Sequence, residues 1–403
     1  MIEFILLACA GVICGIFTGL VPGIHPNTLA LLILSVSPLL LTMFSPAALA
    51  VFIIAAGIIH TFLDFIPSVF LGAPEDSTAL SVLPGHRFLL EGRAYEAIFL
   101  TLVGGIGVII LSILLFPLLN FTLPFIYEGI RSYIAYVLMG IVLVMVLTEK
   151  RMGKLKGLFV FFMAGLLGFI VMDMPMLNSN TLLFPIFTGL FGISTMLLSL
   201  SMKSKIPKQK TEKISIGNKT SFIAIIKGFF SGMFVGILPG IGAAQAAVLT
   251  NVATKQKDVK QFLISLGGIN TVAALFSLMA LYLISKPRSG IAIAVGKIIE
   301  AFGFDHLLLL MFTALFVAGL GVILTLKISK VFSKVVQKVD YKKLTLTIIM
   351  FLVILTIVLA GPVGLFLLGI STVVGLLAPL MNVKRTHSMG VLMLPIMLFY
   401  LGI

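Results

Sequence analysis

One stretch of this sequence occurs twice, and it constrains the fold more than any other feature. Each copy has three glycines four residues apart, followed at the same spacing by Pro-Gly and isoleucine. Such glycines give a helix a smooth face that a neighbouring helix can approach closely. The Pro-Gly pair ends or bends the helix, because proline lacks a backbone donor and glycine admits unusual dihedral angles. The copies are Gly11, Gly15, Gly19, Pro22, Gly23 and Ile24, and Gly228, Gly232, Gly236, Pro239, Gly240 and Ile241.

The composition places both breaks inside a membrane. Hydrophobic residues make up 60% of the chain and charged residues only 10%, and the mean hydropathy is +1.22. Apolar segments of about 17–25 residues, the length of a membrane-spanning helix, recur from end to end. Backbone groups freed at that depth need protein or a water-filled cavity to satisfy them. Each break is therefore predicted to border a polar cavity that could hold a solute.

Basic residues lie in five short runs between apolar segments, and these runs set the predicted topology. The net charge is +14, but under the positive-inside rule such runs mark cytoplasmic loops, so nucleic-acid binding is not expected. The two halves of the chain then have opposite orientations in the cell membrane, with the N- and C-termini outside. The runs are Lys150 to Lys156, Lys203 to Lys219, Lys255 to Lys260, Lys327 to Lys343, and Lys384-Arg385.

The predicted fold is an all-α polytopic membrane protein made of two inverted repeats. Each repeat has a broken helical hairpin at its Pro-Gly motif plus about five transmembrane helices. Residues 1–200 form the first repeat, 201–220 a basic cytoplasmic linker and 221–403 the second. The spans expected are 1–21, 27–44, 47–66, 97–119, 132–147, 158–172 and 181–200, then a hairpin from 221 to Lys255, followed by 261–284, 305–326, 344–360, 362–380 and 388–402.

Two weaker echoes support the duplication. Leu71-Gly72 and Arg93 are matched at constant spacing by Leu266-Gly267 and Arg288. Near the ends of the halves, Gly157-Leu158-Phe159 and Gly168 correspond to Gly364-Leu365-Phe366 and Gly375. Inverted repeats with broken helices that meet near the midplane are typical of secondary transporters.

The paired motifs, together with the run from Leu71 to Ala97, resemble the large membrane subunit of the tripartite tricarboxylate transporters. That run includes Gly72-Ala-Pro74-Glu-Asp-Ser77-Thr78-Ala-Leu and Pro84-Gly85-His86-Arg87. The resemblance implies a permease that works with a small membrane subunit and an extracytoplasmic solute-binding protein, and that moves citrate-like carboxylates down a cation gradient. This chain departs from the family at Gly267 to Thr271, where an acidic, asparagine-rich sequence is usual.

Polar residues follow both breaks and are candidate solute ligands. The returning arms begin with helix N-termini, whose free N–H groups and positive dipole ends suit an anion. Asn27, Thr28 and Gln245 could donate hydrogen bonds to a carboxylate, or Asn27 and Thr28 could simply cap the returning helix. The candidate solute site comprises these three residues with Pro22, Gly23, Pro239 and Gly240.

Two further segments are expected to close the cavity. The stretch from Gly72 through Pro74 to Thr78 looks like the start of a helix, with Ser77 or Asp76 as its cap. It is interpreted as a second wall of the solute site, paired with a loop that carries Asn270 and Thr271. The alternative is an ordinary cytoplasmic loop with solvated acidic residues.

His60 and Asp64 lie four residues apart within an apolar segment and so share one helical face. Ionisable residues at membrane depth are costly, and they indicate a proton relay or cation site. The alternative is a neutral histidine that bonds a carboxylate near the inner interface. No cofactor or metal is expected apart from Na⁺ or H⁺ as the coupling ion.

The predicted function is a secondary active permease for a small organic anion, driven by a proton or sodium gradient through alternating access. The alternatives are a passive channel, a non-transporting assembly subunit and an intramembrane enzyme. Enzyme activity is not predicted, because His-Glu-x-x-His, Gly-x-Ser-x-Gly and Walker-type phosphate loops are absent from the sequence. The predicted partners are the anion, the lipid bilayer and the two family subunits, and a homo-oligomer is compatible with the sequence.

Overall fold

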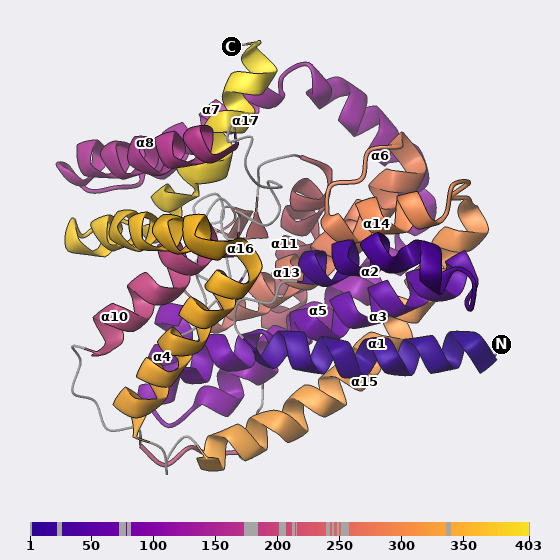
Figure 1. Cartoon of the computed structure of the whole chain (residues 1–403), viewed down its shortest axis with the longest axis horizontal. Helices are drawn as coiled ribbons and strands as arrows, with labels where there is room; N and C mark the ends of the chain where they lie inside the picture. Colours follow the sequence, from indigo (N-terminus) through magenta and orange to yellow (C-terminus); the bar gives the residue numbers. More distant parts are fainter. Residues whose placement is uncertain are drawn as a thin grey trace.

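The fold was analysed in a computed structural model, which describes residues 2–21, 26–71, 78, 82–172, 184–200, 207–211, 214, 216–238, 242, 243, 246, 247, 250, 258–335 and 340–402. Within these residues the regular structure is helical (Figure 1). Eight helices of the described part are long and apolar enough to cross a membrane. The multi-pass helical fold is thus confirmed.

The helices follow the chain in two series. The first is α1 (Ile2–Leu20), α2 (Pro26–Leu40), α3 (Pro46–Leu63), the π-helical turn η1 (Pro67–Leu71), α4 (Val82–Leu90), α5 (Ala94–Leu114), α6 (Phe116–Arg131), α7 (Ile134–Leu147), α8 (Gly153–Met172), the π-helical turn η3 (Thr188–Ile193) and α10 (Ser194–Leu200). The second is α11 (Asn218–Ile237), α13 (Val259–Ile284), α14 (Gly290–Ile298), α15 (Phe304–Val335), α16 (Tyr341–Leu380), the 3-10 turn η4 (Arg385–Met389) and α17 (Gly390–Leu401).

Most of the expected spans coincide with these helices, and two differences stand out. Helix α6 was not predicted, and it meets α7 at an angle of 84°. The spans expected at 344–360 and 362–380 are continuous in α16, which kinks at Gly361 with φ 61° and ψ −158°. Only glycine adopts such angles readily. The boundary predicted between the two spans coincides with this kink at Gly361.

Helices α1 and α11 end where the repeated motif places a break. Helix α1 stops at Leu20 and α2 begins at Pro26, while α11 stops at Ile237. The glycines of the motif do what their spacing predicts. A Cβ atom on Gly11 would lie 2.5 Å from the carbonyl oxygen of Phe52 in α3, and one on Gly236 would overlap Phe276 in α13. Each motif helix therefore packs closely on the long helix that follows it.

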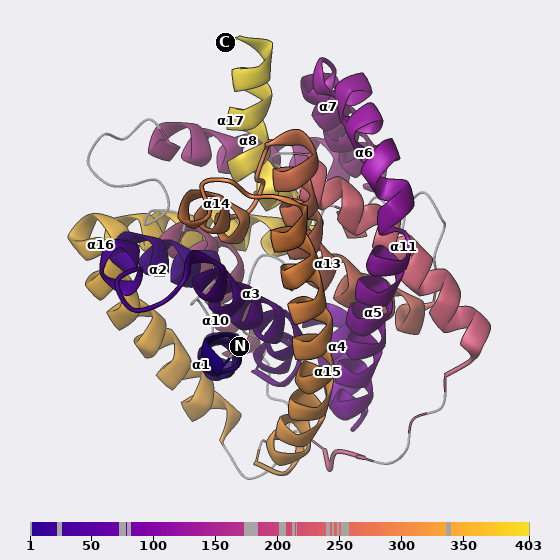
Figure 2. The same ribbon diagram turned by 90° about the vertical axis from the view of Figure 1, so that its right-hand side faces the viewer.

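Helix α3 is buried from Ala48 to its end at Leu63. Its start is fixed by Ser45, whose side chain accepts a hydrogen bond from the N–H of Ala48, and by Pro46 in the first turn. A helix that is apolar on all sides has to be covered on all sides. In both views α1 runs alongside it (Figures 1 and 2).

Much of the remaining cover comes from the other half of the chain, while α2 and α5 of the first half also contact α3. Helix α15 packs on α3, and α5 packs on α13. A Cβ atom on Gly104 in α5 would overlap the carbonyl oxygen of Ile264, and one on Gly267 in α13 would overlap that of Thr101. The long helices of the two halves are therefore interleaved rather than packed as separate bundles.

A second hydrophobic core is likewise built from helices of both halves. It is formed by α8, η3, α16, η4 and α17. Gly168 in α8 packs against the carbonyl oxygen of Val391 in α17, and Gly375 in α16 packs against that of Leu190 in η3. Helices α8 and α17 lie together in both views (Figures 1 and 2).

The echo that matches Leu71 with Leu266 is wrong as a structural correspondence. Leu71 ends the turn η1, whereas Leu266 lies inside α13. Arg93 precedes the long helix α5, whereas Arg288 precedes the short helix α14. The two segments therefore share a residue spacing, but they do not form equivalent helices.

Candidate functional site

A cluster of buried polar side chains lies where α1 ends against α3. His60, in the apolar helix α3, is 1% exposed, and Asp64, directly after the end of α3, is 2% exposed. Thr18 reaches them from α1 and Asn270 from α13, and both are also buried. We call these four residues the buried polar cluster. They join the two halves of the chain.

Hydrogen bonds hold this cluster together. The ring atom Nδ1 of His60 lies 3.1 Å from Oγ1 of Thr18. The amide Nδ2 of Asn270 donates to Oδ2 of Asp64 at 2.8 Å and to the carbonyl oxygen of Thr61 at 3.4 Å. The second ring nitrogen of His60, Nε2, is 3.9 Å from the same Asp64 oxygen. Both of the bonds from Asn270 therefore run through one carboxamide.

Local sequence explains why the acid sits here. Asp64 follows the last residue of α3, and its N–H still bonds the carbonyl oxygen of His60, so the two side chains stay one turn apart. Pro67 begins the wider π-helical turn η1 directly afterwards, because proline offers no N–H for the regular pattern. The predicted shared face of His60 and Asp64 is confirmed, and its position is interior.

Asn270 and Thr271 do not lie in a loop, so that part of the prediction is wrong. Both are buried inside α13, and Thr271 Oγ1 donates to the carbonyl oxygen of Gly267 within the helix. The sequence from Val259 to Ile284 contains no proline. Gly267 and Gly268 do not break the helix, and they make room for α5. Asn270 consequently points to Asp64 instead of closing a cavity as part of a loop.

Asn27 contacts the other half of the chain. It lies inside α2, and its Oδ1 accepts a hydrogen bond from the N–H of Ile291 at the start of α14, at 3.2 Å. A Cβ atom on Gly290 would lie 2.8 Å from that of Asn27. Sequence reasoning missed this contact, although Ser289 is a recognisable N-cap for α14.

The other predicted solute ligands divide into two groups. Thr78 is fully buried, and its carbonyl oxygen accepts a hydrogen bond from Oγ of Ser68 at 3.3 Å. Thr28 lies in α2, and its side chain is outside the described part. Also outside the described residues are Pro22, Gly23, Gly72, Pro74, Ser77, Pro239, Gly240 and Gln245.

The two motif helices end at similar heights along α13. Gly19, next to the end of α1, packs against Leu63 in α3. The residue after Leu63 is Asp64, and Asp64 bonds Asn270 in α13. Gly236, next to the end of α11, packs against Phe276. Asn270 and Phe276 are six residues apart, or about 9 Å at the rise of an α-helix. Both breaks therefore follow helix ends that reach the middle of the bundle.

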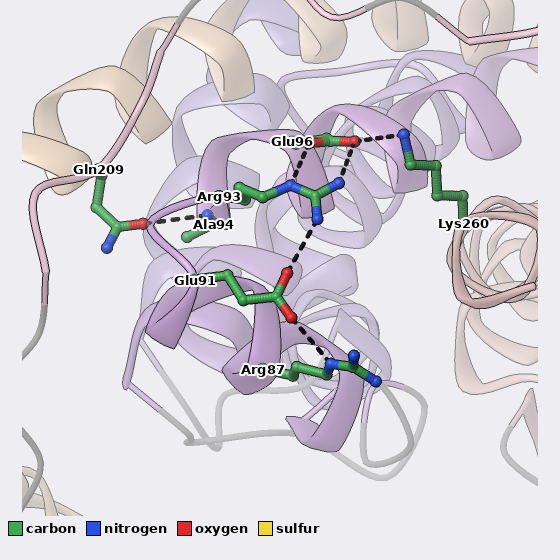
Figure 3. Close-up of polar contacts among 7 residues, drawn as sticks. All are labelled: Arg87, Glu91, Arg93, Ala94, Glu96, Gln209 and Lys260. Atoms are coloured by element: carbon green, nitrogen blue, oxygen red, sulfur yellow. Dashed lines mark hydrogen bonds and ion pairs between the residues drawn. The ribbon is translucent and has the colours of Figure 1, made fainter.

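A charged network joins the two halves at one end of the bundle (Figure 3). Glu96 accepts from Arg93 through both carboxylate oxygens, at 2.8 and 2.9 Å, and pairs with Lys260 of α13 at 2.8 Å. Gln209 of the predicted linker accepts from the N–H of Ala94 nearby. The linker, the basic run that ends at Lys260 and the start of α5 thus meet on one side.

A second polar contact joins the turn before α8 to η4. His387 is fully buried, and its Nε2 lies 3.2 Å from Oε1 of Glu149. The same oxygen accepts from the N–H of Lys384 at 2.9 Å. Burial lowers the pKa of His387 and outweighs the opposing effect of Glu149. The runs around Lys150 and Lys384, predicted to share one side, are therefore in direct contact.

This lowered pKa predicts that acid destabilises the fold. In the unfolded chain His387 takes up a proton near pH 6.5, whereas the folded chain binds it only at lower pH, so stability is lost as the pH falls below about 6.5. We expect the melting temperature of His387→Gln to fall less than that of wild type between pH 7.5 and 5.0. The partly exposed His306→Gln is the control and should keep the wild-type slope. Equal slopes for all three proteins would contradict the prediction.

Comparisons with known proteins agree over almost the entire chain. The sequence model of the family described as "Tripartite tricarboxylate transporter TctA family" matches residues 5–390. An uncharacterized protein of Methanocaldococcus jannaschii is 33% identical over 407 residues, which cover 97% of each chain. No solved structure matches the chain.

Proposed function

The chain belongs to the TctA family of tripartite tricarboxylate transporters, and from this we propose that it is a secondary active carrier for a small organic carboxylate. A cation gradient drives the carrier, and the two halves alternate in opening the site to the two sides of the membrane. The observation that carries the proposal is the buried polar cluster. It links α1, which ends at the first break, to α3 of the same half and to α13 of the other half.

We propose that the two halves are inverted repeats. The packing contacts of the second core support this. Gly168 contacts Val391 and Gly390 contacts Phe161, while Gly375 contacts Leu190 and Gly189 contacts Leu368. The two pairs of contacts are related by constant shifts in residue number. Adding 207 to the residues of α8 gives those of α16, and adding 201 to the residues of η3 gives those at the start of α17. A symmetric exchange of this kind suits two units that move against each other.

The solute would bind between the two hairpin breaks. The donors would be Asn27, Thr28 and Gln245, beside Pro22-Gly23 and Pro239-Gly240, and the segment from Gly72 through Pro74 to Ser77-Thr78 would form a second wall. The matching heights at which α1 and α11 end support this placement. In the proposal Asn270 and Thr271 act from inside α13, and His60 and Asp64 couple the cation.

The proposed setting is the cell membrane, with the basic loops inside and both termini outside. The docking of Gln209, Lys260 and Glu96 on one side supports a shared cytoplasmic face for those loops. Members of this family work with an extracytoplasmic solute-binding protein and a small membrane subunit, and we propose the same partners here. Lys330, from a further basic run, lies over the ring of Tyr95, and this contact supports the same proposed face for that run.

Uptake into proteoliposomes tests the carrier proposal. The purified chain is reconstituted, and labelled citrate, succinate and tartrate are offered with an imposed pH or sodium gradient. Saturable, gradient-dependent uptake of one of these carboxylates is expected. Non-saturating flux would indicate a channel, and no flux in the presence of the two partner subunits would contradict transport.

Replacing the polar residues after the breaks should reduce this uptake. Asn27→Ala removes the acceptor for the N–H of Ile291, which costs about 1 kcal/mol of stability and, in the proposal, a solute ligand. Gln245→Ala should likewise reduce uptake. Asn27→Asp keeps the acceptor, so its stability should match wild type while its negative charge repels the solute. Wild-type uptake in all three variants would remove these residues from the site.

A further inference from the structure

We propose that the second core holds a further anion site, in which Arg385 and Ser388 of η4 bind a carboxylate group. That this carboxylate belongs to the transported solute rests on the proposed carrier function. The site shares no residue with the buried polar cluster or with the solute site proposed at the breaks. Three features of η4 support it: a guanidinium without a carboxylate, buried hydroxyl groups without partners, and a position on the protein-facing side of α16.

The guanidinium of Arg385 is bonded differently from that of Arg93. Arg93 bonds the carboxylates of Glu91 and Glu96 at 2.8 to 2.9 Å. Arg385 is only partly exposed, and in the described part of the chain its bond partner is a hydroxyl, Oγ1 of Thr195. Burial lowers the pKa of Arg385. A buried charge is costly unless it is paired, so an anion at this guanidinium would stabilise it.

Glu149, an acid that contacts η4, is already bonded to other groups. Its Oε1 accepts from the N–H of Lys384 at 2.9 Å and lies 3.2 Å from Nε2 of His387. The side chain of Lys384 turns to Thr148, whose Oγ1 it bonds at 2.7 Å. Among the described contacts, Glu149 therefore serves Lys384 and His387 and does not neutralise Arg385.

Two buried hydroxyl groups next to Arg385 have no bond partner in the described structure. Thr386 is 2% exposed and Ser388 1% exposed. Such atoms are rare in folded proteins, and a bound ion is one explanation for them. The turn η4 is a 3-10 helix, in which side chains three residues apart eclipse each other. Ser388 therefore lies on the same side of the turn as Arg385 and can donate to the same anion.

Thr195 fixes the direction of the guanidinium. Its Oγ1 is placed to donate to the carbonyl oxygen of Phe191, one turn earlier. A hydroxyl has one hydrogen to donate, so this oxygen accepts from Nη1 of Arg385. The guanidinium has five N–H donors in a planar fork, and the bond to Thr195 uses one of them. The others suit the two oxygens of a carboxylate, which arginine binds through two parallel bonds.

The contact with Thr195 lies on the side of α16 that faces protein. Phe366 and Leu380, each 67% exposed, belong to the face of α16 that lipid chains would cover. On the opposite face Ser371 and Gly375 pack against η3. Helix α10, which carries Thr195, continues from η3 and also packs on α16. This position favours a soluble carboxylate over the headgroup of a phospholipid.

Exposed basic residues would draw anions to η4. The bonds of Glu149 join the turn to the segment before α8, and a surface of one charge sign raises the local concentration of counter-ions. This attraction is screened beyond about 8 Å at physiological ionic strength, whereas binding needs the donors of Arg385 and Ser388. The exposed basic residues of the two segments are Lys150, Arg151, Lys154, Lys156 and Lys384.

Calorimetry of the purified protein tests the site without transport. Citrate, succinate and tartrate are titrated into Asn27→Asp, whose added charge disables the solute site proposed at the breaks. At least one of them should bind. Adding Arg385→Gln should weaken this binding about tenfold or more, because charge-assisted hydrogen bonds are lost. Arg385→Lys should also bind more weakly, since an ammonium group lacks the planar fork. Succinamide, the neutral analogue of succinate, should not bind.

Two further variants separate the site from charge and from folding. Lys154→Gln removes a positive charge from the same end of the molecule but no donor of the site, so binding should stay within about twofold. Ser388→Ala should weaken binding about threefold to tenfold, because one hydrogen bond to a charged group is lost. Its melting temperature without ligand should equal or exceed that of wild type, because the buried hydroxyl has no partner to lose. A serine that serves the fold alone would lower the melting temperature and leave binding unchanged.

The results distinguish this site from the carrier proposal. Equal binding with and without Arg385→Gln, or no carboxylate binding by Asn27→Asp, would overturn the site and leave the carrier to the uptake assay. Native mass spectrometry with phosphatidylglycerol tests for a lipid. A phospholipid adduct that depends on Arg385 and is not displaced by the carboxylates would also overturn the proposal. Binding that depends on Arg385, of a carboxylate that is never taken up, would support the site and count against the carrier.

Discussion

Replacing Gly104 with valine should prevent the chain from folding. A Cβ atom at this position would overlap the carbonyl oxygen of Ile264 and would press on Gly268. These obstacles are backbone atoms, so no side chain can rotate away, and α5 would have to separate from α13. Overpacking of this kind costs at least about 3 kcal/mol. The yield of monodisperse protein on size-exclusion chromatography measures the effect.

Two further variants complete this experiment. Gly267→Val tests the same contact from the other helix, because its Cβ would overlap the carbonyl oxygen of Thr101. Gly319→Val in α15 is the control, since nothing lies within 4 Å of a Cβ atom there, and it should give the wild-type yield. A normal yield and melting temperature for Gly104→Val would show that the α5–α13 interface is looser than described.

Removing the carboxamide of Asn270 should have the second-largest effect. Asn270→Leu leaves Asp64 buried without this donor, and loss of a hydrogen bond to a charged group costs about 1.5–3 kcal/mol. Uptake should fall at least tenfold, because the link between α3 and α13 at this point runs through that side chain. Thermal unfolding and uptake of the variant are measured on the same preparation.

A double-mutant cycle measures the interaction energy between Asp64 and Asn270 separately from the effect of each substitution on packing. Asp64→Leu with Asn270→Leu replaces both polar partners by apolar groups and should be more stable than the sum of the single losses predicts. The expected coupling is about 1.5 kcal/mol or more, because a pair removed together leaves no unmatched polar group. Thr271→Val, on the same helix but bonded only within it, is the control. Strict additivity of Asp64→Leu and Asn270→Leu would show that the two side chains do not depend on each other.

The local parts of this fold could be predicted from the sequence, and the long-range parts could not. Length and hydropathy located most of the spans, and Pro22 and Pro239 located the two helix ends. These signals reside in consecutive residues, so a single sequence contains them. The basic runs predicted loops on one side, and two of these loops meet where the N–H of Lys384 bonds Glu149.

The errors have a common physical cause. Asn270 and Thr271 were placed in a loop as the counterpart of the segment from Gly72 to Thr78. In a membrane helix, however, Gly267 and Gly268 serve close packing, and only the position of α5 shows this. The bond from the N–H of Ile291 to Asn27, which joins the two halves, was missed. The partner of Asp64 was missed for the same reason. No local pattern records which distant helix covers a polar side chain.

Helices from both halves of the chain cover α3, and this affects how the protein is made. The helix is complete once residue 71 has been synthesised, but α15 is complete only at Val335. At translation rates of about 5–20 residues per second, roughly 10 to 50 s separate the two events. Asn270, the partner of Asp64 from the second half, is itself made only late in that interval. The insertion machinery therefore has to shelter an acidic helix until the later segments arrive, so biogenesis ends with assembly between halves and not with the insertion of each span in turn.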